Sequence, residues 1–238
     1  MNRQAVNPYL PSWEYIPDGE PHVFNGRVYV YGSHDRFNAP IFCVNDYVCW
    51  SAPVEDLSEW RYEGVIYRKK QDPKNPLGYH LLFAPDVCQG PDGRYYLYYA
   101  FDFLGIMSVA VCDTPAGEYK FLGHIHYADG TLWGRRRGDQ LPFDPGVLAD
   151  DDGRVWLYSG FYNAVPAILT GGHKLRCDGG TVLELEKDMV TIKTEPRVIF
   201  PKKGPGAFQG HEFFEASSIR KEGKTYIFVY SSRHNHEL

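Results

Sequence analysis

The sequence lacks the features that mark several large classes of protein. No apolar run approaches the length that spans a bilayer, and residues 1–15 contain no apolar core of a secretion signal. The longest basic run is only Arg135, Arg136 and Arg137, and the formal net charge is −5. A nucleic-acid partner therefore has no electrostatic support. We expect neither a membrane nor a nucleic acid among the partners of this chain.

Cysteine is too scarce and too irregularly placed to form a structural framework. The five cysteines show no Cys-x-x-Cys spacing: Cys43, Cys49, Cys88, Cys112 and Cys177. Because the number is odd, at least one thiol stays unpaired within the chain. This favours a reducing compartment and argues against structural zinc. We expect a cytoplasmic protein with buried thiols.

Helical periodicity over ten or more residues is almost absent, and turn residues take its place. The chain of 238 residues contains 24 Gly and 17 Pro, spread throughout rather than gathered in a linker. Aromatic residues are abundant, with 18 Tyr, 14 Phe and 5 Trp. Aromatic side chains favour β-strands, and their flat apolar faces also stack on sugar rings. The composition predicts an all-β protein large enough for a substantial core.

One pattern occurs four times: a carboxylate, a short apolar strand, a turn with glycine and a strand rich in tyrosine. The copies begin at Asp18, Asp86, Asp144 and Glu215, and their turn glycines are Gly26, Gly93, Gly153 and Gly223. Asn-Gly and Asp-Gly turns supply the positive φ angles of tight β-hairpins, so each copy predicts a hairpin. The glycines recur about 60 to 70 residues apart, which suits a four-stranded blade with loops. We predict a single β-propeller domain, with blades over about 18–80, 81–140 and 141–208 and a partial fourth blade over 209–238.

The recurring carboxylate carries the functional signal. In a propeller the first strands of successive blades surround one axis, so four equivalent carboxylates should gather at one mouth of the channel. Repulsion and partial burial would raise some of their pKa values. One ionised and one protonated carboxyl group facing each other are what glycosidic cleavage requires. No P-loop, His-Glu-x-x-His or Ser-His-Asp motif competes with this interpretation.

At these residues the chain resembles glycoside hydrolase family 43, which includes β-xylosidases, α-L-arabinofuranosidases and arabinanases. Five segments carry the resemblance: residues 7–11 (Asn-Pro-Tyr-Leu-Pro), 17–19 (Pro-Asp-Gly), 84–86 (Ala-Pro-Asp), 144–153 (Asp-Pro-Gly-Val through Asp-Asp-Asp-Gly) and 210–215 (Gly-His-Glu-Phe-Phe-Glu). The resemblance implies a five-bladed propeller and an inverting hydrolase that acts on arabinose- or xylose-containing plant glycans or oligosaccharides. By the same resemblance Asp18 is the general base, Asp86 modulates the pKa of the acid, and Glu215 is the general acid. No cofactor is required.

The chain also departs from the pattern of the family. The Asp-Pro after the base is replaced by Asp18-Gly19, with Glu20 following, and period-2 alternation would put Asp18 and Glu20 on the same strand face. Glu20 is therefore an alternative base. The usual Trp before Ala-Pro-Asp is Phe83, and the usual Gly-Pro after the acid is Ala-Ser. We assign six residues to substrate binding: Trp13, Glu20, Phe83, Phe143, Asp144 and His211.

Two other functions stay open besides the hydrolase. One is a sugar-binding propeller without turnover, which would use Trp13, Phe83 and Phe143 as stacking platforms. The other is a structural repeat domain whose channel carboxylates hold a structural calcium. The hydrolase interpretation predicts that the carboxyl groups of Asp18 and Glu215 lie about 6.5 to 9.5 Å apart. Because the chain ends within the fourth blade, we also expect another polypeptide or a missing C-terminal segment to close the propeller.

Overall fold

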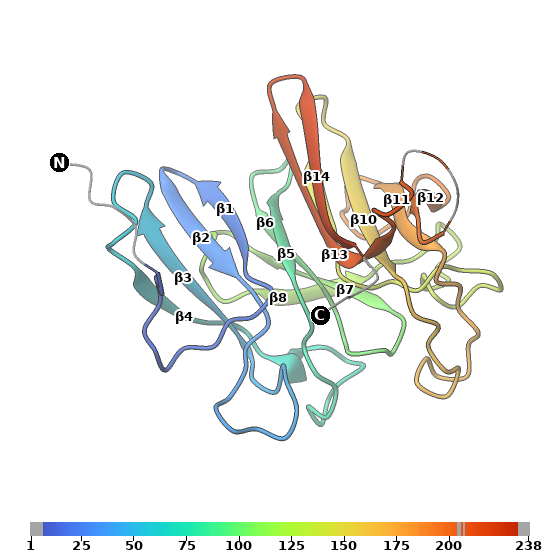
Figure 1. Cartoon of the computed structure of the whole chain (residues 1–238), viewed down its shortest axis with the longest axis horizontal. Helices are drawn as coiled ribbons and strands as arrows, with labels where there is room; N and C mark the ends of the chain where they lie inside the picture. The colour runs from blue at the N-terminus through green and yellow to red at the C-terminus, as the bar shows by residue number, and fades with distance from the viewer. Residues whose placement is uncertain (1–6, 204–205, 207, 233–238) are drawn as a thin grey trace.

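The structure is a computed structural model, and it describes residues 7–203, 206 and 208–232. Within these residues it contains fourteen β-strands and a single 3-10 turn, Lys69–Gln71 (Figure 1). No helix in this part of the chain is long and apolar enough to cross a membrane. The predicted all-β class is confirmed.

Three four-stranded antiparallel sheets follow one another along the chain, each pairing its strands in sequence order. The first contains β1 (Glu20–Phe24), β2 (Arg27–Tyr31), β3 (Tyr47–Pro53) and β4 (Arg61–Tyr67). The second contains β5 (Asp86–Gln89), β6 (Tyr95–Ala100), β7 (Met107–Cys112) and β8 (Lys120–His124). The third contains β9 (Gly146–Ala149), β10 (Val155–Phe161), β11 (Gly179–Leu185) and β12 (Arg197–Pro201). A separate hairpin follows, β13 (Phe213–Glu222) and β14 (Thr225–Ser232).

The hairpin turns form where the sequence predicts them. Asn25 and Gly26 both have positive φ angles, 51° and 75°, between β1 and β2. These are the angles that a tight hairpin turn requires, and Asn and Gly adopt them most readily. Gly93, Gly153 and Gly223 have positive φ angles in the equivalent turns of the other three units. Local turn chemistry therefore fixes the start of each unit.

The aromatic residues pack mainly between neighbouring sheets. Every residue of β6 is buried, and successive side chains point to opposite faces. Tyr96 and Tyr98 join a core with residues of β9, β10 and β11, whereas Tyr95 and Tyr99 join a core with residues of β2, β3 and β4. The buried hydroxyl of Tyr98 donates to the Met189 carbonyl at 2.9 Å. The second sheet is thus buried on both faces by its two neighbours.

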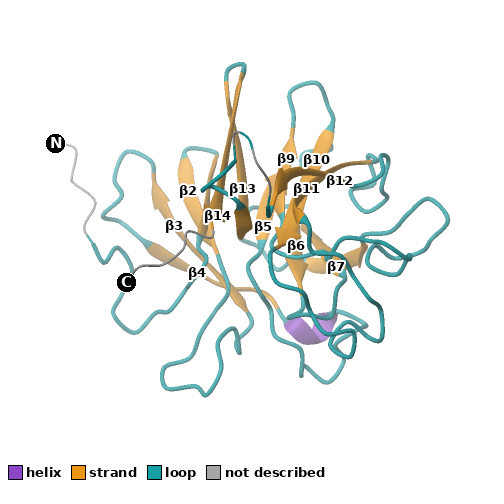
Figure 2. Cartoon of the chain, turned by 45° about the vertical axis from the view of Figure 1, so that its right-hand side comes forward, coloured by secondary structure: helices purple, strands orange, loops and turns teal. Residues whose placement is uncertain are grey.

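The first strands of the four units lie around a common centre (Figures 1 and 2). His22 of β1 contacts Asp86 of β5, and Asp86 accepts a hydrogen bond from the Val147 amide of β9. Strand β9 contacts β13, and Arg220 of β13 forms an ion pair with Glu20 of β1. The prediction that the first strands share one axis is confirmed, and this arrangement brings together side chains up to 200 residues apart.

All five cysteines lie among the described residues, and all are free thiols. Four are buried, and Cys112 is partly buried. The prediction of buried, unpaired thiols is confirmed. The cytoplasmic location that we inferred from them stays a prediction.

Candidate active site

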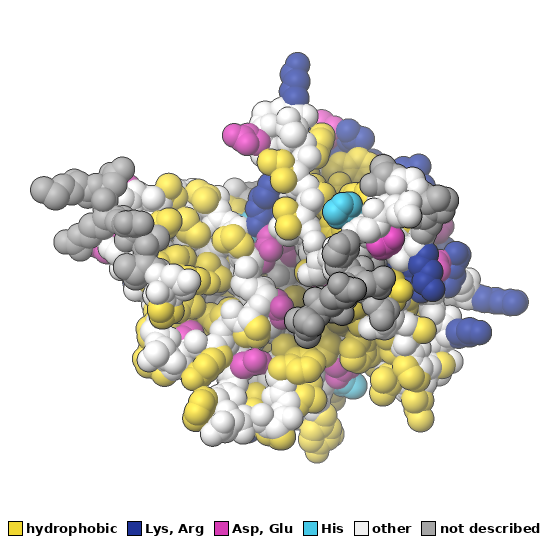
Figure 3. All heavy atoms as spheres, in the orientation of Figure 1, with side chains coloured by type: hydrophobic (Ala, Val, Ile, Leu, Met, Phe, Trp, Pro, Cys, Tyr) yellow, Lys and Arg dark blue, Asp and Glu magenta, His cyan; other side chains and the backbone are white. Residues whose placement is uncertain are grey.

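A pocket of about 360 Å³ opens where the chain enters the first strands. Figure 3 shows acidic side chains in the middle of the molecule, with hydrophobic side chains around them. The pocket is lined by Asp18, Gly19, Glu20, Ala84, Pro85, Asp144, Pro145, Glu215, Ala216, Ser217, Ser218, Val229, Tyr230 and Ser231. Three of the four predicted carboxylates, Asp18, Asp144 and Glu215, therefore share one site.

The backbone at this pocket is strained in three places. Asp18, Asp144 and Ala216 have φ angles of 55°, 46° and 61°, in the left-handed region that non-glycine residues rarely occupy. Such conformations cost of order 1–3 kcal/mol each and cluster at functional sites. The pairing of β13 with β14 also shifts register on both sides of Glu215. A bulge of this kind re-aims a side chain, and here it turns the strand at the carboxyl group of Glu215.

Asp18 is exposed to solvent and is held from one side. The hydroxyl of Ser33 lies 2.9 Å from Asp18 Oδ2 and 3.1 Å from the carbonyl oxygen of Pro17, both of which are acceptors. Ser33 itself is fully buried. A buried donor thus orients a carboxylate that water can reach, which suits a group that takes a proton from water.

Asp144 and Glu215 have a different environment. Burial raises the pKa of Asp144 well above its ordinary value, and the nearby charges of Glu215 and Asp18 raise it further. The Ala216 amide donates to Asp144 Oδ2 at 3.2 Å and partly opposes this shift. Burial, and then the charge of Asp18, also raises the pKa of Glu215. Burial and charge therefore favour the protonated forms of these two carboxyl groups.

Asp86 does not lie where we predicted. It is absent from the lining of the pocket, and it is fully buried deeper in the channel. His22 Nε2 lies 2.6 Å from its Oδ1 atom, and the Val147 amide donates to its Oδ2 atom at 2.6 Å. The structure therefore does not place Asp86 in the pocket with Glu215, and Asp144 occupies the position expected for it.

The strand register explains this correction. Glu20 pairs with Tyr31, Asp86 with Tyr98, and Gly146 with Tyr158, at the same point of each unit. Asp86 is thus equivalent to Glu20. Asp18 and Asp144, each two residues earlier, are equivalent to each other and to Ala84. The channel consequently has two layers, the outer with Asp18 and Asp144 and the inner with Glu20 and Asp86.

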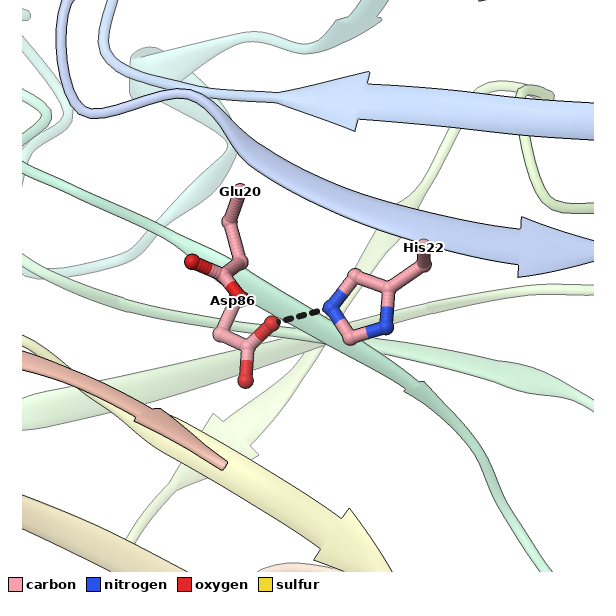
Figure 4. Close-up of side chains that lie close together, drawn as sticks. All are labelled: Glu20, His22 and Asp86. Carbon is pink, nitrogen blue, oxygen red and sulfur yellow. Dashed lines mark hydrogen bonds and ion pairs between the residues drawn. The ribbon is translucent and has the colours of Figure 1, made fainter. Parts of the chain in front are cut away.

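Glu20 and Asp86 form the inner layer together with His22 (Figure 4). Glu20 forms an ion pair with Arg220 and accepts a hydrogen bond from Ser218 at 2.9 Å. Burial raises the pKa of Glu20, as does the charge of Asp86, whereas Arg220 lowers it. Glu20 lines the pocket as predicted, but its carboxylate is neutralised by Arg220. Asp18 lies in a turn before β1, so strand alternation does not apply to it, but Asp18 and Glu20 both line the pocket.

The expected calcium site would lie in the inner layer. Glu20, His22 and Asp86 each offer one ligand atom, and these atoms lie within 4.8 Å of one another. Calcium takes six to eight oxygen ligands. Arg220 already places a cation on Glu20, and His22 already bonds to Asp86. This donor set is paired within the protein and does not fit calcium.

The predicted stacking platforms are not open to the pocket. Phe83 and Phe143 are only 6% and 4% exposed, with ring centroids 5.7 Å apart in an aromatic cluster. Their role as platforms is wrong, because rings buried on both faces cannot receive a sugar. Trp13 is 65% exposed, but it packs near Trp50 and is not a lining residue.

His211 is not a lining residue of the pocket, but it contacts one. Its carbonyl oxygen accepts a hydrogen bond of 2.5 Å from the hydroxyl of Tyr230, which lines the pocket. Tyr230 and Ser33 are residues that the motifs did not indicate. Tyr230 lies within the tyrosine-rich strand of the fourth repeat, β14, whereas no sequence signal marked Ser33.

Comparison with known proteins adds an independent finding. The model of glycosyl hydrolases family 43 matches residues 17–236. The chain belongs to glycosyl hydrolase family 43. It is 60% identical over 242 aligned residues to a xylosidase/arabinosidase of Thermoclostridium stercorarium, covering 100% of this chain and 49% of that protein. The chain therefore spans about half the length of this relative.

Other members of the family are similar to most of this chain. Xylosidase/arabinosidase 43A of Humicola insolens is 31% identical, with 94% of this chain and 74% of that protein covered. Among solved structures, CoXyl43, a β-xylosidase/α-arabinofuranosidase from a compost metagenome in complex with xylotriose, aligns with a TM-score of 0.69. Its identity is 26%, and the alignment covers 96% of this chain and 73% of that chain. The resemblance inferred from five short motifs is confirmed.

Proposed function

We propose that the chain is the catalytic part of an inverting glycoside hydrolase that cleaves xylose- or arabinose-containing glycans. The observation that carries the proposal is the pocket with Asp18, Asp144 and Glu215 in unlike environments. Asp18 is exposed and held by Ser33, whereas burial and charge raise the pKa values of the other two. Two carboxyl groups in such different environments can act as the base and the acid of one reaction.

The roles follow from these environments. Asp18 takes a proton from a water molecule as the water oxygen attacks the anomeric carbon. Glu215 gives its proton to the leaving glycosidic oxygen as the carbon–oxygen bond breaks. Asp144 accepts the amide of Ala216, the residue next to the acid, and so positions Glu215. Solvent then returns a proton to Glu215 and removes one from Asp18.

The substrate class draws its support from relatives. The proteins of T. stercorarium and H. insolens are both named xylosidase/arabinosidase. The CoXyl43 structure contains xylotriose. The pocket has room for a sugar ring, and its polar lining offers several acceptors for hydroxyl groups. A pentose unit of a xylan or arabinan fragment is the substrate that these observations favour.

We also propose that the fold is a five-bladed propeller, which residues outside this chain complete. Apolar side chains are exposed on the first sheet and on the last hairpin: Val23 of β1 is 62% exposed, and Val229 of β14 is 60% exposed. Strand β14 pairs only with β13 among the described strands, so its other edge can accept a further strand. Additional polypeptide in this position would bury these side chains.

Hydrolysis of para-nitrophenyl α-L-arabinofuranoside and β-D-xylopyranoside tests the function. We expect wild-type protein to release nitrophenol from at least one of them, with inversion visible in the NMR spectrum of the first sugar formed. Glu215→Gln and Asp18→Asn should each lower kcat by roughly 10²–10⁴-fold. A folded wild type without turnover that still binds xylo-oligosaccharides would support the binding module instead.

A further inference from the structure

The proposed base and the proposed acid belong to units that no strand pairing joins. Asp18 precedes β1 of the first sheet, whereas Glu215 lies on β13 of the last hairpin. The strands of the first sheet pair only with one another, as do β13 and β14. Within the described part of the chain no backbone–backbone hydrogen bond joins β1 to β13. Side chains therefore have to fix the distance between the two carboxyl groups, on which an inverting reaction depends.

Three side-chain contacts from β13 reach β1 across the channel at one point. Arg220 forms an ion pair with Glu20, and its guanidinium also donates to the carbonyl oxygen of Pro21 at 2.6 Å. Ser218 Oγ donates to Glu20 Oε1 at 2.9 Å. Among the described residues, these are the hydrogen bonds that join the strands of the first sheet to those of the hairpin.

This connection holds the chain close to both carboxyl groups. Glu20 follows Asp18 by two residues and is the first paired residue of β1. Ser218 follows Glu215 by three residues, and the regular pairing of β13 with β14 begins there, after the bulge at Glu215. A displacement of Glu20 relative to Ser218 would therefore change the separation of the base and the acid.

Arg220 makes its contacts from outside the carboxylate pocket. Glu20 and Ser218 line that pocket, whereas Arg220 and His22 line a second cavity of about 530 Å³. Because Arg220 and Glu20 are bonded to each other, their ion pair lies between the two cavities. The planar guanidinium contacts β1 at two points, a side chain and a carbonyl oxygen, which a lysine ammonium would hold less rigidly.

We propose that Arg220, acting through Glu20, is a positioning residue that fixes the distance between the general base Asp18 and the general acid Glu215. This inference rests on the proposed hydrolase function and deepens it, because it gives Glu20 a role other than that of the base. A group displaced by about 1 Å can lower a catalysed rate by roughly 10²-fold. Loss of the Glu20–Arg220 pair should therefore lower kcat much more than it changes KM.

Steady-state kinetics on the para-nitrophenyl glycosides tests this role, with circular dichroism to confirm that each variant is folded. We expect Arg220→Met to lower kcat about tenfold and to change KM by less than about threefold. Arg220→Lys keeps the charge without the two-point contact, so its kcat should be intermediate. It also decides the question if Arg220→Met does not fold.

Lys221→Met is the matched control. Lys221 is the next residue of β13, and its ion pairs with Asp150 and Asp151 join the hairpin to the third unit instead of the first. We expect this variant to keep the kcat of the wild type. A loss of kcat as large as that in Arg220→Met would show general loosening of the hairpin and would overturn the positioning role.

A double variant tests whether Glu20 and Arg220 act together. If they do, Glu20→Gln combined with Arg220→Met should be no slower than the slower single variant, whereas multiplied losses overturn the joint action. An active wild type with unchanged kcat in Arg220→Met and Arg220→Lys overturns the positioning role and leaves the hydrolase intact. A folded wild type that hydrolyses neither glycoside overturns the hydrolase, and the positioning role with it.

Discussion

Replacing Asp144 and Asp86 by asparagine should change the stability of the protein in opposite directions. Other carboxyl groups repel the charge of Asp144, whereas hydrogen-bond donors surround Asp86. Asp144 is 7% exposed, faces two other carboxyl groups and receives the Ala216 amide. An asparagine oxygen can still accept that amide, while the charge repulsion disappears. We expect Asp144→Asn to stabilise the protein at pH 7 by ~1–2 kcal/mol. For a chain of this length this is a rise in Tm of roughly 2–8 °C.

The Asp86 carboxylate accepts from three donors, namely His22 Nε2 and the Val87 and Val147 amides. An asparagine side chain has one acceptor oxygen and an NH₂ group, so at least one buried donor loses its partner. This should destabilise the protein by about 1–3 kcal/mol. The two substitutions change the same chemical group, and only the structure predicts that one raises the stability of the protein and the other lowers it.

The gain in Asp144→Asn should also depend on pH. Because the pKa of Asp144 is raised in the folded state, the folded protein binds a proton more tightly than the unfolded chain. Wild-type stability therefore falls as pH rises above the unfolded value of about 3.9 and towards the raised folded pKa. The difference between variant and wild type should be small below about pH 4 and should grow towards neutral pH.

Urea unfolding at several pH values, with kcat/KM measured on the same samples, checks these expectations. Asp144→Asn should be the less active of the two by at least about tenfold, because Asp144 lies in the pocket with Glu215 whereas Asp86 does not line it. If Asp86→Asn is folded yet less active than Asp144→Asn, the assignment of the modulator to Asp144 is refuted. A loss of stability in Asp144→Asn at pH 7 would refute the electrostatic argument.

Two further predictions concern the residues around the carboxylates. Ser33→Ala removes the donor that holds Asp18, and steady-state kinetics should show kcat about tenfold lower with KM changed much less; an equal effect on both would contradict a positioning role. Ala216→Gly relieves a φ angle of 61°, and chemical denaturation should show a gain of about 0.5–1 kcal/mol, whereas a loss would show that the conformation is not strained.

Much of the fold followed from local sequence patterns. The Asn-Gly and Asp-Gly turns and the alternating apolar residues predicted the hairpins of all four units, because turn geometry and strand pleat depend on neighbouring residues. The outer strand β12 (Arg197–Pro201) has little buried surface, and no such local pattern marks it. The family was also evident from the motifs around Asp18 and Glu215.

The site was only partly predictable. Counting residues back from the turn glycines placed Asp18, Asp86, Asp144 and Glu215 in one group, since their offsets differ by at most two residues. The strand register places Asp18 and Asp144 two residues before the position that Asp86 occupies, and this difference moves the side chain by one layer of the channel. Strand pairing decides the layer, and it put Asp86 beside His22 instead of Glu215.

By itself the sequence determined the class of the fold, the repeat, the family and the two carboxyl groups that face one pocket, because these depend on short-range patterns and on motifs. The tertiary structure alone decided which third carboxylate joins them, which aromatic rings are buried and which serine holds the base. Phe83 and Phe143 are enclosed by residues of other units, and Ser33 meets Asp18 only after the hairpin has folded back. The burial of a side chain and its hydrogen-bond partners depend on residues far apart in the chain, so no local pattern predicts them.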